Sequence, residues 1–437
     1  MSKVFIAFLG TTDYNECVYY FDKNNIPDKS YKYIQEYLIN ELCTDWTNED
    51  KILILLTEES KEKNWNNKLE GKLNDLGLKT EIKAINTPHG KTRDEIWETF
   101  DILCKEFDKE EYKEIIFDIT HSFRSLPMLM MSLINYLKSL KKIEDISIYY
   151  GAFTESDETK VIKGSTIKIA PVFDLSAFSD LHDWSYAINS FIKNGIATDM
   201  KELTRKEINP IFKKGDNNSQ LRKLSNMANA LDYVSNKIST SCLRKILLYD
   251  FNRVITNIDS LMKMNLIINP LIPLLKVLKN KLEHFNTDNY IIKGFYTIEW
   301  CIEYNLIQQG LTILSEFIIT YFAEKLGNKW STNDIRLRLD ISKFVQRATV
   351  PREKRNVEGN IDKDKENYEL YNKIENLLNN NTDYSDLANL YSSVTDNRNI
   401  VNHACFSDTE PRVLEDKLKD NYEKAKEIIY KIEEIKE

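Results

Sequence analysis

The sequence predicts an α/β domain at the N-terminus, built on a mostly parallel sheet, followed by an all-α region. From residue 1 to about 175, short apolar runs alternate with longer amphipathic segments, an order typical of a doubly wound sheet. After about residue 180 the strand signals end, and one helical pattern follows another. At 437 residues the chain is long enough for two or three domains with separate cores.

The expected strands are continuous apolar runs, the pattern of strands covered on both faces, at Val4–Leu9, Ile52–Leu56, Thr80–Ile85, Ile115–Ile119 and Ile146–Tyr150. The helices expected between them carry apolar residues at three- and four-residue spacing, at Tyr31–Leu42, Lys61–Leu76, Asp94–Phe107 and Ser125–Leu140. The same spacing predicts later helices at Leu221–Ile238, Cys242–Met264 and Gly294–Leu326. Residues 327–386 are rich in Lys, Asn and Asp, so we expect a partly ordered polar insertion there.

Charge and cysteine usage narrow the class of protein. The net charge of -8 and the pI of about 5.5 argue against a surface coated with basic residues for long duplex DNA, although they allow a local basic cleft. The six cysteines are spread singly without zinc-ligand spacing, which predicts reduced, mostly buried thiols and no metal site. Neither the apolar start, Met1–Gly10, nor the proline-interrupted run Leu266–Leu278 is long enough for a signal-peptide core or a membrane span. We therefore expect a cytoplasmic protein.

Three loops at the carboxyl ends of the expected strands carry hydroxyl, imidazole and cationic groups. They contain Gly10, Thr11 and Thr12; His89 and Lys91; and Thr120, His121, Ser122, Phe123 and Arg124. Ligands of open parallel sheets bind at this edge because loops and helix N-termini meet there. The sequence therefore predicts a pocket for a phosphorylated ligand. It has neither a glycine-rich dinucleotide fingerprint nor a Walker-type phosphate loop, so a nicotinamide or ATP enzyme is not expected.

A second candidate site is the pair Arg398 and His403 in a segment with a helical pattern. Histidine gives or takes a proton near neutral pH, and arginine offers a permanent forked cation to a phosphate. RNA supplies its own nucleophile, the 2′-hydroxyl, so such a pair is sufficient for metal-free cleavage that leaves a 2′,3′-cyclic phosphate. We expect His403 to act as general base or acid and Arg398 as phosphate clamp. Asn399 and Asn402 would hold the substrate or orient the histidine.

The spacing of the pair also predicts a dimer. On a regular helix, five positions rotate a side chain by about 140°, so Arg398 and His403 do not share one face. Two such helices about a twofold axis would bring both pairs to one groove. A symmetric dimer is therefore the smallest active unit that we expect.

Both candidate sites resemble parts of one known family. The opening Val4–Thr11 followed by Asp118–Pro127 resembles the sensor domain of CRISPR-associated Rossmann-fold (CARF) proteins. The segment Ile302–Glu324, followed by Arg398 and His403, resembles the HEPN ribonuclease domain of CARF effectors in type III CRISPR systems. This resemblance implies a Rossmann-like CARF domain at residues 1–180, a helical linker at 181–290 and a HEPN domain at 291–437 that contains the polar insertion.

The resemblance further implies a ligand-switched endoribonuclease of antiviral defence. A cyclic oligoadenylate would bind across the dimer of sensor domains, and the paired HEPN domains would then cleave single-stranded RNA. Cyclic tetra-adenylate is the expected activator on the resemblance alone, and no cofactor is expected. Ser122 departs from the glycine that relatives often have, which leaves the shape of that loop open.

Other interpretations of the same residues stay open. The chain is alternatively a non-enzymatic, ligand-responsive regulator that uses basic residues between 200 and 260 to bind DNA or a protein partner, with Arg398 and His403 incidental. Thr120 or Ser122 alternatively caps a helix, while His121 and Arg124 face water. Beside RNA cleavage, the sensor loops are candidates for a ring nuclease that degrades the activator.

Overall fold

The computed structural model describes residues 2–109, 112–121, 126–140, 143, 145–154, 157–208, 219–263, 272–350, 365–404, 406 and 410–435. Three residues of the expected ligand loop, Ser122, Phe123 and Arg124, lie outside the described residues. The chain divides into two compact units, Met1–His182 and Asp183–Glu437.

An eight-stranded, mostly parallel sheet lies at the centre of the first unit. Its strand order is β2-β8-β6-β5-β1-β3-β4, with β7 paired to β8. Among the strands that the structure describes, only the β6–β8 and β7–β8 pairs are antiparallel. The strands are β1 (Lys3–Phe8), β2 (Cys17–Tyr20), β3 (Lys51–Leu56), β4 (Glu81–Asn86), β5 (Glu114–Asp118), β6 (Asp145–Gly151), β7 (Thr159–Ile162) and β8 (Ser165–Asp174). The predicted mostly parallel sheet is confirmed.

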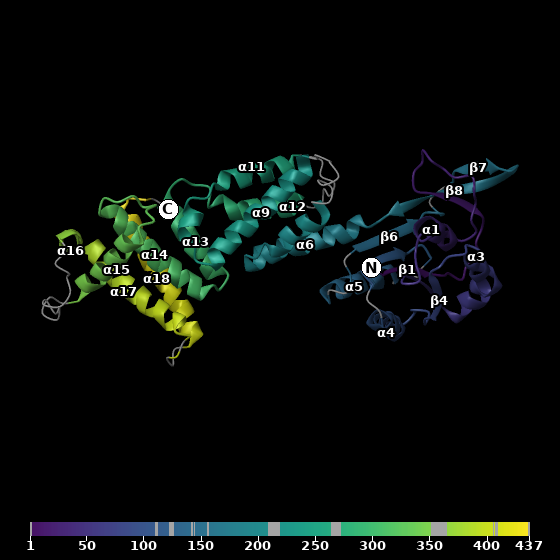
Figure 1. Ribbon diagram of the computed structural model, residues 1–437, viewed down its shortest axis with the longest axis horizontal. Helices are drawn as coiled ribbons and strands as arrows, with labels where there is room; N and C mark the ends of the chain where they lie inside the picture. The colour runs from purple at the N-terminus through teal and green to yellow at the C-terminus, as the bar shows by residue number, and fades with distance from the viewer. Residues whose placement is uncertain are drawn as a thin grey trace. The chain divides into compact units, whose positions relative to one another are not determined.

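Helices cover both faces of this sheet (Figure 1), which explains the continuous apolar runs. Successive side chains of a strand point to opposite faces, so Phe5 and Ala7 of β1 join one core while Val4 and Ile6 join the other. One core contains α1 (Ile34–Leu42), η1 (Lys61–Leu69), which follows the short α2 (Glu58–Ser60), and α3 (Glu70–Asn74); the other contains α4 (Arg93–Lys109) and α5 (Leu126–Ser139).

Two features of the first unit differ from the sequence-based prediction. Strands β2, β7 and β8 are absent from the sequence-based prediction. Strand β2 is short, and its partner β8 lies about 150 residues later in the chain, so no local pattern indicates the pair. The helix expected at Lys61–Leu76 is interrupted: Asn66 has an extended backbone, and Asn67 has a φ of 55°. Asparagine adopts this left-handed conformation more readily than most residues, which accounts for the kink.

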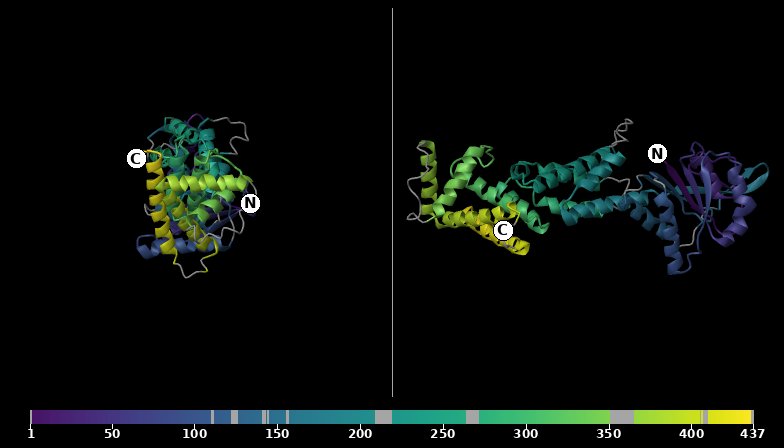
Figure 2. Two further views of the ribbon diagram at one scale, coloured as in Figure 1. Left: turned by 90° about the vertical axis from the view of Figure 1, so that its left-hand side faces the viewer. Right: turned by 60° about the horizontal axis from the view of Figure 1, so that its bottom comes forward.

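The second unit is helical in its described part and includes most of α6. Its helices are α6 (Ala177–Asn194), α7 (Thr198–Leu203), η2 (Thr204–Ile208), α9 (Ser219–Ser239), α10 (Leu243–Leu247), α11 (Phe251–Met262), α12 (Ile272–Glu283), α13 (Tyr290–Glu303), α14 (Ile307–Lys325), α15 (Ile335–Thr349), α16 (Lys365–Asn380), α17 (Thr382–Asn402) and α18 (Pro411–Ile432). The apolar helix α14 packs against α13, α15, α17 and α18. The C-terminal helices, drawn in green to yellow, gather together in both views of Figure 2. It forms the centre of the C-terminal helices.

Two helices expected in this unit are wrong, and the described part of the expected insertion is helical. The segment Cys242–Met264 forms two helices, because Asp250 accepts a hydrogen bond from the Arg253 amide and caps the start of α11. The segment Gly294–Leu326 also forms two helices, α13 and α14, separated at Asn305 with a φ of 55°. The polar insertion contains α15, α16 and the first residues of α17, and these helices pack against one another.

Tertiary packing explains how a polar segment becomes helical. Buried residues of α15 and α16, Ile341, Phe344 and Ile374 among them, supply an apolar stripe within the otherwise polar sequence. None of the described helices combines the length and the apolar character that a bilayer crossing needs. Cys17, Cys43 and Cys301 are buried free thiols, as predicted, whereas Cys104 and Cys242 are half-buried.

Candidate functional site

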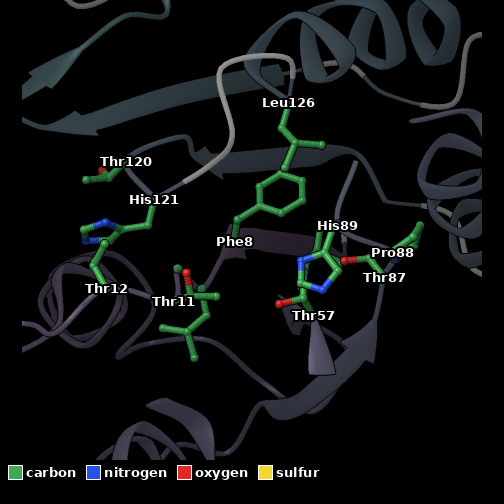
Figure 3. Close-up of a pocket in the computed structure, with 13 residues that line it drawn as sticks. Phe8, Thr11, Thr12, Thr57, Thr87, Pro88, His89, Thr120, His121 and Leu126 are labelled. Atoms are coloured by element: carbon green, nitrogen blue, oxygen red, sulfur yellow. The ribbon is translucent and has the colours of Figure 1, made fainter. Parts of the chain in front are cut away.

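A pocket opens at the carboxyl edge of the sheet in the first unit (Figure 3). Four adjacent parallel strands, β5, β1, β3 and β4, end there, and the loops that follow them form its walls. Its volume is about 240 Å³, and it is lined by Phe8, Leu9, Gly10, Thr11, Thr12, Leu55, Thr57, Thr87, Pro88, His89, Thr120, His121 and Leu126.

The sheet topology explains why the pocket forms at this edge. From β1 the chain adds β3 and β4 on one side, and then returns to place β5 on the other side of β1. The loops after β1 and β5 therefore diverge toward opposite faces and leave a crevice between them. This is the topological switch point at which open α/β sheets bind their ligands.

Side chains from elsewhere in the fold hold the loop after β1. The Asn64 amide, only 3% exposed, donates hydrogen bonds of 2.9 Å to the carbonyl oxygens of both Gly10 and Thr12. The Gly10 amide donates to the Tyr14 hydroxyl at 2.8 Å, and burial raises the pKa of Tyr14, so the phenol stays neutral at pH 7. The backbone of Gly10 and Thr12 is thus fixed before a ligand arrives.

The loop after β5 is organised around Asp118 and Thr120. The Thr120 amide donates to Oδ1 of Asp118 at 2.9 Å, and the Thr120 hydroxyl accepts a 2.8 Å hydrogen bond from the Gly151 amide. A Cβ atom at Gly151 would lie 1.8 Å from Cδ1 of the buried Ile34, whose side chain would have to shift to admit it. The turn presents Thr120 and His121 at the pocket.

The two histidines of the pocket have buried ring nitrogens without a hydrogen-bond partner among the described residues. They are Nδ1 of His89 and Nε2 of His121, and their rings lie on either side of Thr11 in Figure 3. The His121 ring also packs edge-on against Tyr14, with ring centroids 4.5 Å apart. Unpaired buried polar atoms are costly, so this pair indicates a place where a bound ligand supplies the missing hydrogen bonds.

The structure brings together most of the residues that the sequence singled out. Gly10, Thr11, Thr12, His89, Thr120 and His121 all line the pocket. Lys91 is exposed and lies outside this lining, with its amide donating to the Glu95 carboxylate at 2.8 Å. The alternative in which this loop only caps a helix expects His121 to face water. In the structure, Nε2 of His121 is instead shielded from solvent.

Some pocket residues were not predicted as site residues. Thr57 and Thr87 follow β3 and β4, so the rule that ligands bind beyond strand ends identifies them from the sequence. Asn64 and Tyr14 had no comparable signal. Asn64 acts across more than 50 residues of sequence, and only the packing of η1 beside the loop after β1 brings it there.

Two buried titratable groups at this turn, Asp118 and His121, make the free energy of unfolding change with pH in opposite directions. Burial raises the pKa of Asp118 to about 6, so its contribution to stability is present at low pH and is lost as pH rises through about 6. Burial lowers the pKa of His121 to about 4, so its contribution increases as pH rises from about 4 to 6.5. Each shift corresponds to roughly 3 kcal/mol at about 1.4 kcal/mol per pKa unit, and the two nearly cancel.

We therefore expect Asp118→Asn and His121→Gln to change the pH dependence in opposite directions. Relative to the wild type, the free energy of unfolding of Asp118→Asn should rise by up to roughly 3 kcal/mol between pH 4 and 6.5. That of His121→Gln should fall over the same range. Urea unfolding at half-unit pH steps measures both, and three parallel curves would contradict the assignment.

The second candidate site lies at the C-terminal end of α17 in the helical unit. Arg398 is half-buried on this helix, and His403 is the exposed residue that ends it, with its amide bonded to the Asn399 carbonyl at 2.9 Å. Nη1 of Arg398 donates to the Ser315 hydroxyl at 3.4 Å, and Nη2 donates to Oδ1 of Asn399 at 3.2 Å.

The four residues predicted at this site therefore occupy one helix end. Asn399 and Asn402 are exposed, and Asn402 accepts a hydrogen bond from α14, from Gln308 at 3.2 Å. Because the backbone leaves the helix at His403, its side chain is not constrained to the face that a continued helix would give it. The end of α17 thus presents a guanidinium, an imidazole and two amides.

Comparison with known proteins supports a CARF-containing, CRISPR-associated protein. Residues 4–158 match the CARF domain of the CRISPR system endoribonuclease Csx1. The chain is 31% identical over 127 residues to CRISPR-associated protein MJ1674 of Methanocaldococcus jannaschii, a match that covers 29% of this chain and 19% of the relative. The chain thus matches about a fifth of that relative's length. The family match includes the pocket residues and ends before the helical unit.

Proposed function

We propose that this protein is a cyclic-oligoadenylate-activated, metal-independent endoribonuclease that cleaves single-stranded RNA in type III CRISPR defence. The match of residues 4–158 supports the sensor part of the proposal. The observation that carries the nuclease part is the end of α17, where Arg398 is anchored to α14 and His403 is exposed. The resemblance of this segment to HEPN ribonucleases supports the same activity.

The proposed chemistry follows from the groups at this helix end. His403 takes the proton of the RNA 2′-hydroxyl or gives one to the leaving 5′-oxygen. The Arg398 guanidinium stabilises the charge that develops on the phosphate, because its N–H donors match phosphate oxygens. Asn399 and Asn402 are exposed beside these groups, and they hold the sugar-phosphate chain.

The pocket of the first unit is the proposed binding site of the activator. CARF domains bind ligands of the cyclic oligoadenylate type, and hydroxyls and imidazoles that line the pocket are suited to phosphate and adenine groups. A volume of about 240 Å³ holds part of such a ligand, so the remainder would extend to the same loops of a second subunit. The ring-nuclease activity that the sequence leaves open would be located at these same residues.

A dimer completes the proposed nuclease site. His403 ends α17 while Arg398 lies more than one turn before it, so a single chain offers one guanidinium and one imidazole in different directions. A twofold axis near this helix end would supply two of each to one RNA strand. Ligand binding would favour the arrangement in which both pairs face the groove, and a preference of about 1–3 kcal/mol is ordinary for such coupling.

The proposal is tested by incubating the purified protein with fluorescent single-stranded RNA and cyclic tri-, tetra- or hexa-adenylate. Cleavage should require one of the nucleotides, persist in excess EDTA and give fragments with 2′,3′-cyclic phosphate ends, which mass spectrometry identifies. Cleavage that stops in EDTA and recovers with a divalent cation would contradict the metal-free mechanism. A protein that shifts duplex DNA in a gel and leaves RNA intact would instead be the regulator.

A further inference from the structure

Helix α14 is apolar along most of its length, yet it turns two polar side chains toward α17. Ser315 is 0% exposed among residues such as Leu311, Leu314 and Ile318, and its hydroxyl accepts from Nη1 of Arg398. A hydroxyl in such surroundings is costly unless it is hydrogen-bonded. Its position opposite Arg398 therefore indicates a role beyond packing.

Gln308 makes the second contact between the two helices. It lies seven residues before Ser315, which places both on one face of α14. Its Nε2 donates to Oδ1 of Asn402, whereas Ser315 accepts from Arg398, one helical turn earlier on α17. The helices are antiparallel, so two residues of α14 reach two predicted site residues of α17.

These contacts restrict the Arg398 guanidinium and the Asn402 amide. Nη1 of Arg398 is directed at Ser315, Nη2 at Asn399, and Nε is buried without a hydrogen-bond partner among the described residues. The remaining N–H groups of the two Nη atoms are then left for a phosphate. Because Oδ1 of Asn402 accepts from Gln308, the Nδ2 donor of Asn402 is left for a substrate next to His403.

We propose that Ser315 and Gln308 are positioning residues of the RNA-cleaving site. Ser315 sets the direction of the Arg398 guanidinium, and Gln308 sets the orientation of the Asn402 amide. This inference rests on the proposed ribonuclease activity. It means that α14 orients the Arg398 guanidinium and the Asn402 amide of α17. Misplacing a reacting group by about 1 Å costs about a hundredfold in rate, which sets the scale of the effect.

The first test is a double-mutant cycle between Ser315 and Arg398. Ser315→Ala should lower kcat for RNA cleavage about 10- to 100-fold with little change in KM, measured with saturating activator. In an Arg398→Ala background the same substitution should have no further effect. Thr320→Ala is the matched control, because Thr320 is a buried residue of α14 that accepts from Arg338 instead. It should leave kcat unchanged.

The second test uses Gln308, which is exposed and so can be changed without threatening the fold. Gln308→Ala should lower kcat about 10-fold, and Gln308→Glu should lower it at least as much. A carboxylate cannot donate to Asn402, and it would accept from Nδ2 of Asn402 and withdraw that donor from the substrate. Gln309→Ala is the control, since Gln309 donates to the Ser239 carbonyl.

The outcomes separate this inference from the function on which it rests. If the wild type does not cleave RNA, the proposed function fails. If the wild type cleaves RNA and Ser315→Ala or Gln308→Glu cleaves it equally well, only the positioning role fails. A Ser315→Ala loss that adds in full to that of Arg398→Ala also overturns the inference, because it shows that Ser315 acts independently of Arg398.

Discussion

Arg398→Ala and His403→Ala are each expected to lower RNA cleavage by at least about a hundredfold, and by as much as about ten-thousandfold. Loss of one group that stabilises developing charge typically costs about 10²–10³ in rate, and loss of a general acid or base about 10²–10⁴. The double variant should lose little more than the worse single variant, since both groups serve one transition state. Single-turnover cleavage of a fluorescent RNA, with saturating activator, measures all three.

Matched controls exist within the same helical unit. Arg336 is an exposed residue of α15, and His284 is the exposed residue that follows α12. Arg336→Ala and His284→Ala should cleave RNA at the wild-type rate. Thermal unfolding should also be unchanged by His403→Ala, because His403 is exposed and surface changes are usually within about 0.5 kcal/mol. Cleavage by His403→Ala at close to the wild-type rate would exclude the histidine from the chemistry and return Arg398 and His403 to the regulator interpretation.

His121→Leu is expected to weaken activator binding by about 10- to 100-fold. Leucine is similar in size to histidine but offers no hydrogen bond, so a ligand group that pairs with the buried Nε2 would lose its partner, at a cost of about 1–3 kcal/mol. In the wild type, a ligand at about 100 times its Kd adds about 2.7 kcal/mol to stability, which corresponds to roughly 5–10 °C in Tm. At the same concentration the variant should gain only about 0.4–1.4 kcal/mol, which is at most about half of the wild-type shift in Tm.

The control for this experiment is His182→Leu, an exposed histidine of α6 outside the pocket lining. Its ligand-induced shift in Tm should equal that of the wild type. RNA cleavage by His121→Leu should recover when the activator concentration is raised about 10- to 100-fold, because the nuclease groups are intact. A variant with the wild-type shift would show that the ligand binds elsewhere, and the pocket assignment would be wrong.

Local sequence patterns were sufficient for the central strands and for the positions of the two candidate sites. Strands such as β1 are apolar at every position because helices cover both faces, and no distant residue is needed to recognise them. The rule that ligands bind beyond strand ends predicts Thr11, His89 and Thr120 at one edge from the sequence alone.

The sequence by itself determined the alternation of the five central strands with helices and the chemical groups, Arg398 and His403 among them, because these depend on residues close together in the chain. Only the tertiary structure decided that the described parts of the segment at 327–386 pack as helices, that Asn64 holds the loop after β1, and that α14 anchors Arg398. Each of these rests on a contact between residues far apart in the sequence. Such a contact forms, and stabilises the protein, only when the chain between its two residues has folded. No local sequence pattern therefore predicts it.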